Sequence, residues 1–293
     1  MRTAPDQMTA IAELPVSVYT PDSPLRHPGQ FFIGMWRGLM ASRELAWRLT
    51  VRDFAALYRQ SYAGYVWAFL PPLVASATFV LLHQGGVISF GDTGIPYPAF
   101  VIISTILWQI FVDSLNNPTR AMQGSMQMLI KINFPREALI LSAVQMSLIG
   151  LGIRLVVLLP VLLWYRFPLE SSILLFPVGA IGLVLLGTMI GLFLGTIGML
   201  YQDVQRGMAL VTTFWMFLTP VVFPGVRDGA VGMIMQINPV TYVLATSRDW
   251  LTGQPPEFLV GFMVVMLLNV AGLAAGWLMY RLFLPRVIER LGM

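Results

Sequence analysis

The apolar residues of this chain form long continuous runs that are separated by short polar segments. We interpret six of these runs as membrane spans, at residues 66–84, 98–117, 138–163, 173–199, 208–223 and 258–282. Several reach the roughly 20 residues that a helix needs to cross a bilayer core. Outer-membrane barrels consist instead of short strands in which apolar and polar residues alternate. The pattern therefore predicts an all-α integral membrane protein.

The segment before the first span has a helical periodicity. Between residues 31 and 63, apolar side chains recur mostly three, four or seven positions apart, which places them on one face of a helix. That face carries Trp36, Met40, Trp47, Val51, Phe54 and Tyr58, whereas Arg37, Arg48, Arg52 and Arg59 fall largely on other faces. Such a helix is typical of the plane of a membrane interface, where arginines meet anionic headgroups. Packing against another domain is the alternative, but the pattern shows no soluble domain.

The chain divides into four parts on this pattern. Residues 1–30 are polar and proline-containing, and we expect a flexible cytosolic tail there and not a signal peptide. The interfacial helix at 31–63, a six-span domain at 64–285 and a cytosolic C-terminus at 286–293 follow. Inside the six-span domain, residues 224–257 mix prolines with short apolar patches. Irregular backbone at membrane depth must be covered by protein or face water, so we expect short broken helices that are partly re-entrant.

Composition supports the membrane assignment. The chain is 57% hydrophobic and only 11% charged, whereas a soluble domain is about half apolar and about a quarter charged. It has no cysteine and only two histidines, which are far apart, so we expect no disulfide and no metal site. The net charge of +4 gives no reason to expect nucleic-acid binding, because in a membrane protein it reflects the placement of the loops.

The basic residues predict the orientation. If the N-terminus is cytoplasmic, the outer segments hold only Arg166, Arg227 and Arg248, Arg154 lies within a span, and the other basic residues fall on the inner side. The positive-inside rule therefore predicts that both chain ends are cytoplasmic.

Two charges fall inside the apolar runs. Asp113 lies about 22 Å from the outer end of the second span, and Arg154 lies about 24 Å from the inner end of the third. We therefore expect them near opposite faces and do not expect them to pair. Asp113 is then an interfacial residue near the cytoplasm. Arg154 either faces a conduit or extends its side chain to the outer headgroups.

Small and aromatic residues add two further patterns. Gly187, Gly191 and Gly195 are spaced for close helix packing, within the chain or between copies. Aromatic residues gather near the span ends, at Trp67, Phe69, Trp108, Phe111, Trp164, Trp215 and Phe217. An interfacial aromatic belt is the default interpretation. Because sugar rings stack on aromatic side chains, a conduit for a sugar polymer would be lined in the same way.

The segment MLIKINFPREALIL, residues 128–141, concentrates polar chemistry between two apolar runs. It holds the only lysine, Lys131, and places Phe134 and Pro135 in a cytoplasmic connection, which indicates a partner that receives them. An ordinary loop with anchoring basic residues is the alternative. No G-x-x-x-x-G-K-[ST], G-x-S-x-G or H-E-x-x-H sequence occurs. A conduit or carrier is therefore expected rather than an enzyme.

Five motifs occur in one order along the chain. They are LYRQSYAGYVWAFLPPLV (57–74), GIPYPAFVIISTILWQIF (94–111), KINFPREALIL (131–141), FLTPVVFP (217–224) and INPVTYV (237–243). Together they resemble the ABC-2 type permeases that export polysaccharides, over about residues 40–285.

The resemblance implies a half-transporter that binds no cofactor itself. Two copies would form a channel, and two copies of a separate subunit would bind ATP and Mg²⁺. The loop between the second and third spans would be the coupling helix that contacts this subunit, with Lys131, Asn133, Phe134, Pro135, Arg136 and Glu137. A second contact would lie at 201–207, with Asp203, Gln205 and Arg206. The family often has Arg-Asp-Val there, whereas this chain has Gln202, so the arginine's role is absent or falls to Arg206.

The implied substrate is a lipid-linked sugar polymer, such as O-antigen, capsule or teichoic acid, that crosses the cytoplasmic (inner) membrane. Trp67, Phe69, Trp108, Phe111, Trp215 and Phe217 would line its path together with Arg154, which would favour an anionic polymer or a lipid diphosphate. Two alternatives remain at this stage. One is an exporter of a small lipophilic molecule or drug, and the other is a structural membrane protein unrelated to ABC transporters.

Overall fold

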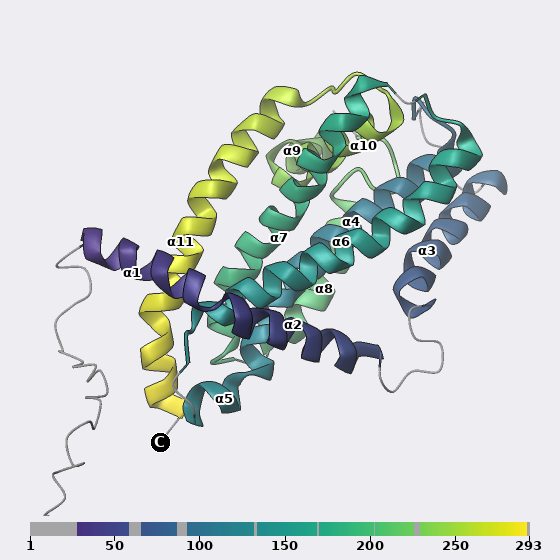
Figure 1. Cartoon of the computed structure of the whole chain (residues 1–293). Helices are drawn as coiled ribbons and strands as arrows, with labels where there is room; N and C mark the ends of the chain where they lie inside the picture. The colour runs from purple at the N-terminus through teal and green to yellow at the C-terminus, as the bar shows by residue number, and fades with distance from the viewer. Residues whose placement is uncertain are drawn as a thin grey trace, which may run out of the picture. The chain divides into compact units, whose positions relative to one another are not determined.

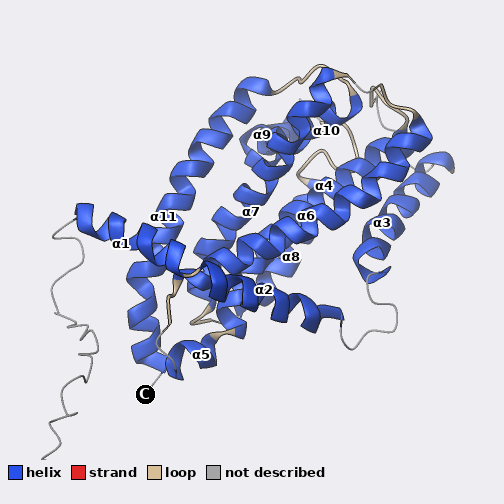
Figure 2. Ribbon diagram, in the orientation of Figure 1, coloured by secondary structure: helices blue, strands red, loops and turns tan. Residues whose placement is uncertain are grey.

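The computed structural model describes residues 28–58, 66–86, 93–131, 134–168, 170–201, 203–225 and 229–291. Within these residues every regular element is a helix (Figures 1 and 2). The elements are α1 (Pro28–Ala41), α2 (Arg43–Tyr58), α3 (Val66–Gln84), α4 (Tyr97–Gly124), α5 (Met126–Lys131), α6 (Glu137–Tyr165), the 3-10 helix η2 (Ser171–Leu175), α7 (Phe176–Gly198), α8 (Asp203–Phe217), α9 (Gly229–Ile237), α10 (Pro239–Thr252) and α11 (Leu259–Leu291). The all-α prediction is confirmed for this part of the chain.

Four helical stretches of the described residues are long and apolar enough to cross a bilayer. They are Tyr97–Gly124, Glu137–Tyr165, Ser171–Gly198 and Leu259–Arg290, and they correspond to the second, third, fourth and sixth predicted spans. The first predicted run coincides with α3. The fifth corresponds to α8, whose 15 residues reach only about 22 Å.

The fifth predicted run, 208–223, ends too late. Helix α8 stops at Phe217, and a turn that contains Pro220 follows. Proline has no N–H group and its ring clashes with the preceding helical turn, so the helix cannot continue through it. The next segment forms the short helices α9 and α10, in keeping with the broken helices that we expected between 224 and 257.

The α4–α7 pair is the most extensive helix contact in the structure. A Cβ on Gly187 would lie 2.6 Å from the carbonyl oxygen of Phe111, and one on Gly191 would overlap the carbonyl oxygen of Leu115. One on Gly195 would lie 2.9 Å from Sδ of Met122. These three glycines, the glycine ridge of α7, therefore pack against α4 of the same chain. Because residue numbers rise together along this contact, α4 and α7 run parallel.

Helix α6 runs antiparallel to α4 on another side. Nδ2 of Asn117 in α4 donates a hydrogen bond to Oγ of Ser147 in α6 at 2.9 Å. At the ends of α4 and α7, Nε2 of Gln123 donates to the carbonyl oxygen of Gly198 at 3.0 Å. The last turns of α4 and α7 and the first turn of α6 therefore lie at the same end of the bundle.

At the opposite end, Asn238 joins the turn after α8 to the start of α10. Its Oδ1 accepts hydrogen bonds from the Val240 N–H and from Nε1 of Trp215, each at 3.1 Å. Its Nδ2 donates to the carbonyl oxygen of Leu218 at 3.0 Å and to Oγ1 of Thr219 at 2.8 Å. Asn238 is thus both the N-cap of α10 and the link between two of the five motifs.

We predict that Gly191→Ala destabilises the chain by about 1–3 kcal/mol, because the added methyl group must displace the backbone of α4 at Leu115. Gly152→Ala is the matched control, since nothing lies within 4 Å of a Cβ at that helical position. The control should be neutral or slightly stabilising. The measurement is the melting temperature of the detergent-purified protein, followed by size-exclusion chromatography after heating. Equal melting temperatures for the two variants would contradict the packing assigned to the ridge.

Candidate functional site

The predicted coupling segment lies between α5 and α6, at the bundle end that carries the last turns of α4 and α7. Lys131 and Pro135 are exposed, whereas Phe134 and Arg136 are half-buried. Asn133 lies outside the described residues. Phe134 packs against a buried cluster that includes Leu139, Tyr280 and Leu284. The segment therefore presents a small polar surface over an apolar base.

Glu137 points inward from this segment. Only 7% of the residue is exposed, and its Oε1 lies 3.6 Å from Nη1 of Arg281 in α11. A Cβ on Gly38 would lie 3.0 Å from the Glu137 carboxyl carbon, so glycine allows this close approach. The hydroxyl of Tyr280 donates to the carbonyl oxygen of Arg136 at 3.0 Å. These contacts fasten the start of α6 to α11.

The second predicted contact lies at the start of α8. Asp203, Gln205 and Arg206 are all exposed, and Nη1 of Arg206 lies 3.7 Å from Oδ1 of Asp203. The hydrogen bond from Gln123 to Gly198 holds the preceding turn against α4. The structure therefore brings both predicted contacts to one end of the bundle.

The predicted interfacial helix is divided into α1 and α2 at Ser42. Trp36 and Trp47 are 59% and 55% exposed. Arg48 pairs with Glu44 at 2.6 Å and Arg52 pairs with Asp53 at 2.8 Å, while the Tyr58 side chain and Arg59 lie outside the described residues.

Helix α2 packs on α6 through a face that the sequence analysis did not identify. Ala46 and Leu49 are buried there, and Oγ1 of Thr50 lies 2.8 Å from Oε1 of Gln145 in α6. The predicted aromatic face of α2 stays exposed at Trp47 and Val51.

The prediction that Asp113 and Arg154 do not pair is wrong. Nη1 of Arg154 lies 2.5 Å from Oδ2 of Asp113, and the two side chains are 12% and 34% exposed. Helix α4 continues past the predicted end at 117 to Gly124. From the shared end of the bundle, Asp113 lies about 16 Å and Arg154 about 25 Å along their helices, so a long arginine side chain spans the difference. The charge of Arg154 is therefore balanced by Asp113. We assign Arg154 to the contact between α4 and α6.

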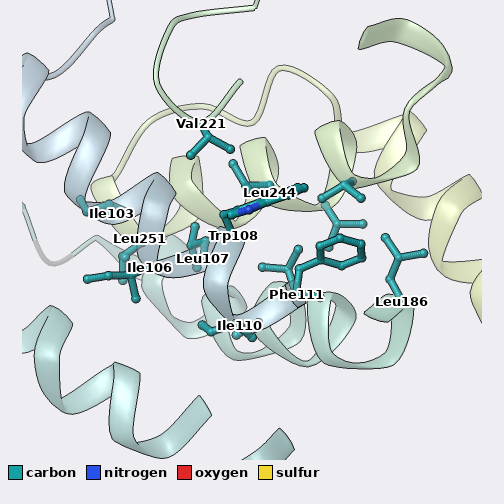
Figure 3. Close-up of a cluster of buried hydrophobic side chains, with 14 of the residues drawn as sticks. Ile103, Ile106, Leu107, Trp108, Ile110, Phe111, Leu186, Val221, Leu244 and Leu251 are labelled. Carbon is teal, nitrogen blue, oxygen red and sulfur yellow. The ribbon is translucent and has the colours of Figure 1, made fainter. Parts of the chain in front are cut away.

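Two aromatic residues predicted to line a path lie in the core. Trp108 and Phe111 are 2% and 0% exposed and lie among the buried side chains of Figure 3. The ring centre of Trp215 lies 5.3 Å from the ring centre of Phe111 and 6.3 Å from that of Trp108. We therefore assign Trp108 and Phe111 to packing. Phe217 is 43% exposed, and the side chains of Trp67 and Phe69 lie outside the described residues.

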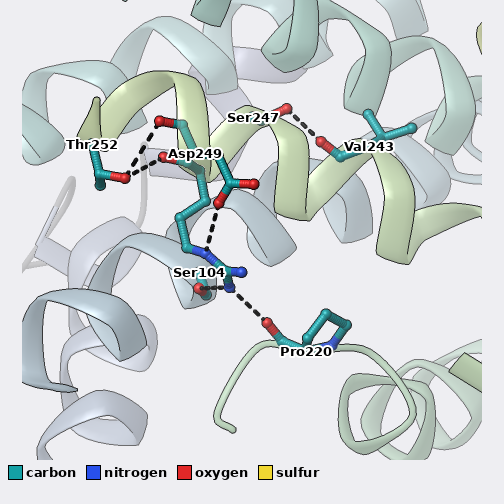
Figure 4. Close-up of polar contacts among 7 residues, drawn as sticks. Ser104, Pro220, Val243, Ser247, Asp249 and Thr252 are labelled. Atoms are coloured by element: carbon teal, nitrogen blue, oxygen red, sulfur yellow. Dashed lines mark hydrogen bonds and ion pairs between the residues drawn. The ribbon is translucent and has the colours of Figure 1, made fainter. Parts of the chain in front are cut away.

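Sequence reasoning missed a polar cluster in α10. Nη1 of Arg248 donates to Oγ of Ser104 at 3.0 Å and to the carbonyl oxygen of Pro220 at 2.9 Å (Figure 4). The central carbon of the guanidinium lies 4.2 Å from the Phe100 ring centre. Nε of Arg248 lies 3.9 Å from Oδ1 of Asp249. Burial raises the pKa of Asp249 to about 6, against the lowering effect of the Arg248 charge. The signal in the sequence was this pair of adjacent charges in a largely apolar segment.

Comparison with known proteins agrees with the five motifs. Residues 44–249, which run from α2 into α10, match the family described as ABC-2 type transporter. The chain is 26% identical over 215 residues to an O-antigen export system permease protein RfbA from Myxococcus xanthus, across 72% of this chain and 79% of the relative.

A protein of the same name from Klebsiella pneumoniae is 24% identical over 208 residues, across 69% of this chain and 77% of the relative. The family match covers most of the chain and includes three of the four spanning helical stretches. The resemblance proposed from the motifs is confirmed, and this chain belongs to the ABC-2 type transporter family.

Proposed function

We propose that this chain is the permease subunit of an ATP-driven exporter that moves a lipid-linked polysaccharide across the cytoplasmic membrane. The observation that carries the proposal is the similarity to two O-antigen export permeases over more than two thirds of both chains. ATP hydrolysis belongs to a separate subunit, because the only lysine lies between Ile130 and Ile132 and is not part of a phosphate-binding loop.

The contact with that subunit is proposed at the bundle end that carries the coupling segment. The exposed Lys131 and Pro135 contribute the docking surface, and Arg206 contributes a second point. Glu137 has a different role, since its carboxylate is turned toward Arg281. A displacement of the coupling segment would therefore also move α6 and α11. We further propose two copies of each subunit, with both ends of this chain in the cytoplasm.

The translocation path is proposed between two copies and not through one. Within the described residues, the interior of a single chain is filled by the apolar cluster around Trp108 and Phe111. Helix α8 exposes Leu210, Phe214 and Phe217. In the proposed dimer, this surface with its aromatic rings would face the second copy. Arg154 takes no part in this path, because Asp113 neutralises it.

We predict that Lys131→Glu with Pro135→Asp abolishes the complex with the ATP-binding subunit. The changes reverse a charge and add one on an exposed surface, so they should leave the fold intact. The measurement is co-purification and ATPase activity after co-expression with candidate ATP-binding subunits. Arg290→Glu, an exposed residue of α11 outside the segment, is the charge-reversal control and should retain the complex. A complex that tolerates the double change as well as the control would remove the assigned docking surface.

Deletion of the gene should leave lipid-linked polymer inside the cell and remove it from the surface, and the wild-type chain should restore export. The measurement is immunoblotting or gel analysis of polymer in intact and lysed cells. Unchanged surface polymer, together with intracellular accumulation of a small lipophilic compound, would contradict the proposal in favour of the alternative exporter class.

A further inference from the structure

A cavity of about 330 Å³ lies between α2, α4 and α6. Helix α2 crosses α6 in this region (Figure 1). The wall includes Gly124, the last residue of α4, and Ser142, in the second turn of α6. The cavity therefore lies at the bundle end that carries the coupling segment. Its volume is at the lower end of the range of about 300–1,000 Å³ that is usual for small-ligand sites.

The cavity lies at the depth of the lipid headgroups. Arg120, which lines it, is about 35 Å along α4 from Tyr97, at 1.5 Å per residue. The hydrocarbon core of a bilayer is only about 30 Å thick, so on the proposed orientation Arg120 reaches the inner headgroup layer. Helix α2 exposes Trp47 and Val51, as expected for a helix in this layer.

One cation in the wall has no partner. Arg120 is exposed and makes no hydrogen bond or ion pair with any described residue. Nε of Arg52 lies 2.8 Å from Oδ1 of Asp53, so these two lining charges balance each other. Residues 59–65, which follow α2 and lie outside the described residues, contain no acidic residue. The charge of Arg120 therefore favours an anionic ligand.

The same wall has an apolar part. Leu57 is 53% exposed and lines the cavity together with the half-buried Met146 and the buried Ala143. A free phosphate ion would leave these side chains uncovered. A phosphate group that carries acyl chains would contact both parts of the wall.

The charge of the described wall favours a phosphodiester over a diphosphate. The phosphate of a phospholipid carries a single negative charge, which one guanidinium group can balance through paired hydrogen bonds. The diphosphate of a polyprenyl carrier has a higher charge and would require further cations. Basic pockets between membrane-spanning helices on the cytoplasmic side are typical sites for anionic lipid headgroups.

We propose that this cavity binds the headgroup of an anionic phospholipid from the inner leaflet. Arg120 balances the phosphate, and Leu57 and Met146 contact the upper part of the acyl chains. The bound lipid holds α2, which packs on α6, against α4 as well. The inference uses the proposed orientation of the chain but does not depend on which substrate is exported.

The test is native mass spectrometry and titration of the detergent-purified full-length chain with defined lipids. The probes are phosphatidylglycerol, phosphatidylcholine, a polyprenyl diphosphate and inorganic phosphate. A single phosphatidylglycerol should bind per chain, more tightly than phosphatidylcholine, whose choline group would bring a second positive charge beside Arg120. Inorganic phosphate should not displace it, because the ion cannot cover Leu57 and Met146.

Charge variants test the role of Arg120. Arg120→Gln should weaken the binding of phosphatidylglycerol about five-fold, as expected for one basic residue at an anionic surface. Arg120→Lys should keep most of the binding, because it keeps the charge. Arg43→Gln is the matched control, since it removes an exposed arginine of α2 that does not line the cavity, and it should have no effect.

A steric variant tests the cavity without changing its charge. Nothing lies within 4 Å of a Cβ on Gly124, so the side chain of Gly124→Leu can occupy the cavity and should exclude the lipid. Gly152→Leu, at an equally open position of α6 outside the cavity, should bind lipid as the wild-type chain does. Because a ligand stabilises the folded state that binds it, phosphatidylglycerol should raise the melting temperature of the control more than that of Gly124→Leu.

Three results would overturn the proposal. They are equal binding of phosphatidylglycerol and phosphatidylcholine, unchanged binding by Arg120→Gln, and displacement of the lipid by inorganic phosphate. Displacement by the polyprenyl diphosphate would assign the cavity to the lipid carrier of the exported polymer, and the phospholipid assignment would then be wrong. Arg120→Gln should leave the melting temperature unchanged when no lipid is added, and a clear fall would show that Arg120 serves the fold instead.

Discussion

The close approach of α4 and α7 is the constraint on which the rest of the structure depends. Lipid offers no hydrophobic drive between helices, so association in a bilayer relies on tight packing and hydrogen bonds. Gly187, Gly191 and Gly195 bring the α7 backbone against that of α4. Helix α4 carries Ser104 near one end and Gln123 near the other. One parallel helix pair therefore positions both the contact to Arg248 in α10 and the turn that precedes α8.

Buried charge serves the scaffold in this chain. Arg154 meets Asp113, Glu137 meets Arg281, and Arg248 meets Ser104, Pro220 and Phe100. An unpaired buried charge is strongly unfavourable, and each of these groups has a partner on another element. These buried charges thus hold one element against another. The path that we propose between two copies would then need only apolar and aromatic surface.

Sequence reasoning could predict the features that depend on local patterns. The run at 138–163 lies within α6, Glu137–Tyr165, and the glycine spacing predicted close helix packing. The sequence could not predict the partner of Arg154, because α4 extends through polar residues beyond the apolar run. This extension changes the level of Asp113 relative to Arg154.

The candidate site was predictable only in part, for a related reason. A helix that is apolar on all sides gives no sign of which face is buried, so the burial of Trp108 and Phe111 could not be read from periodicity. The inward direction of Glu137 depends on Arg281, which is 144 residues away in the chain. Asn238 did carry a readable signal, since asparagine before proline is a common start of a helix.

On the proposed orientation, the coupling segment and the Arg248 cluster of α10 lie on opposite sides of the membrane. The chain has no cysteine, so single cysteines can be introduced without a background. Gln127→Cys in α5 and Ser171→Cys in η2 are exposed positions at the two ends of the bundle. We predict that a membrane-impermeant maleimide labels Ser171→Cys in intact spheroplasts and labels Gln127→Cys only after permeabilisation. The reverse pattern, or labelling of both positions from one side, would contradict it.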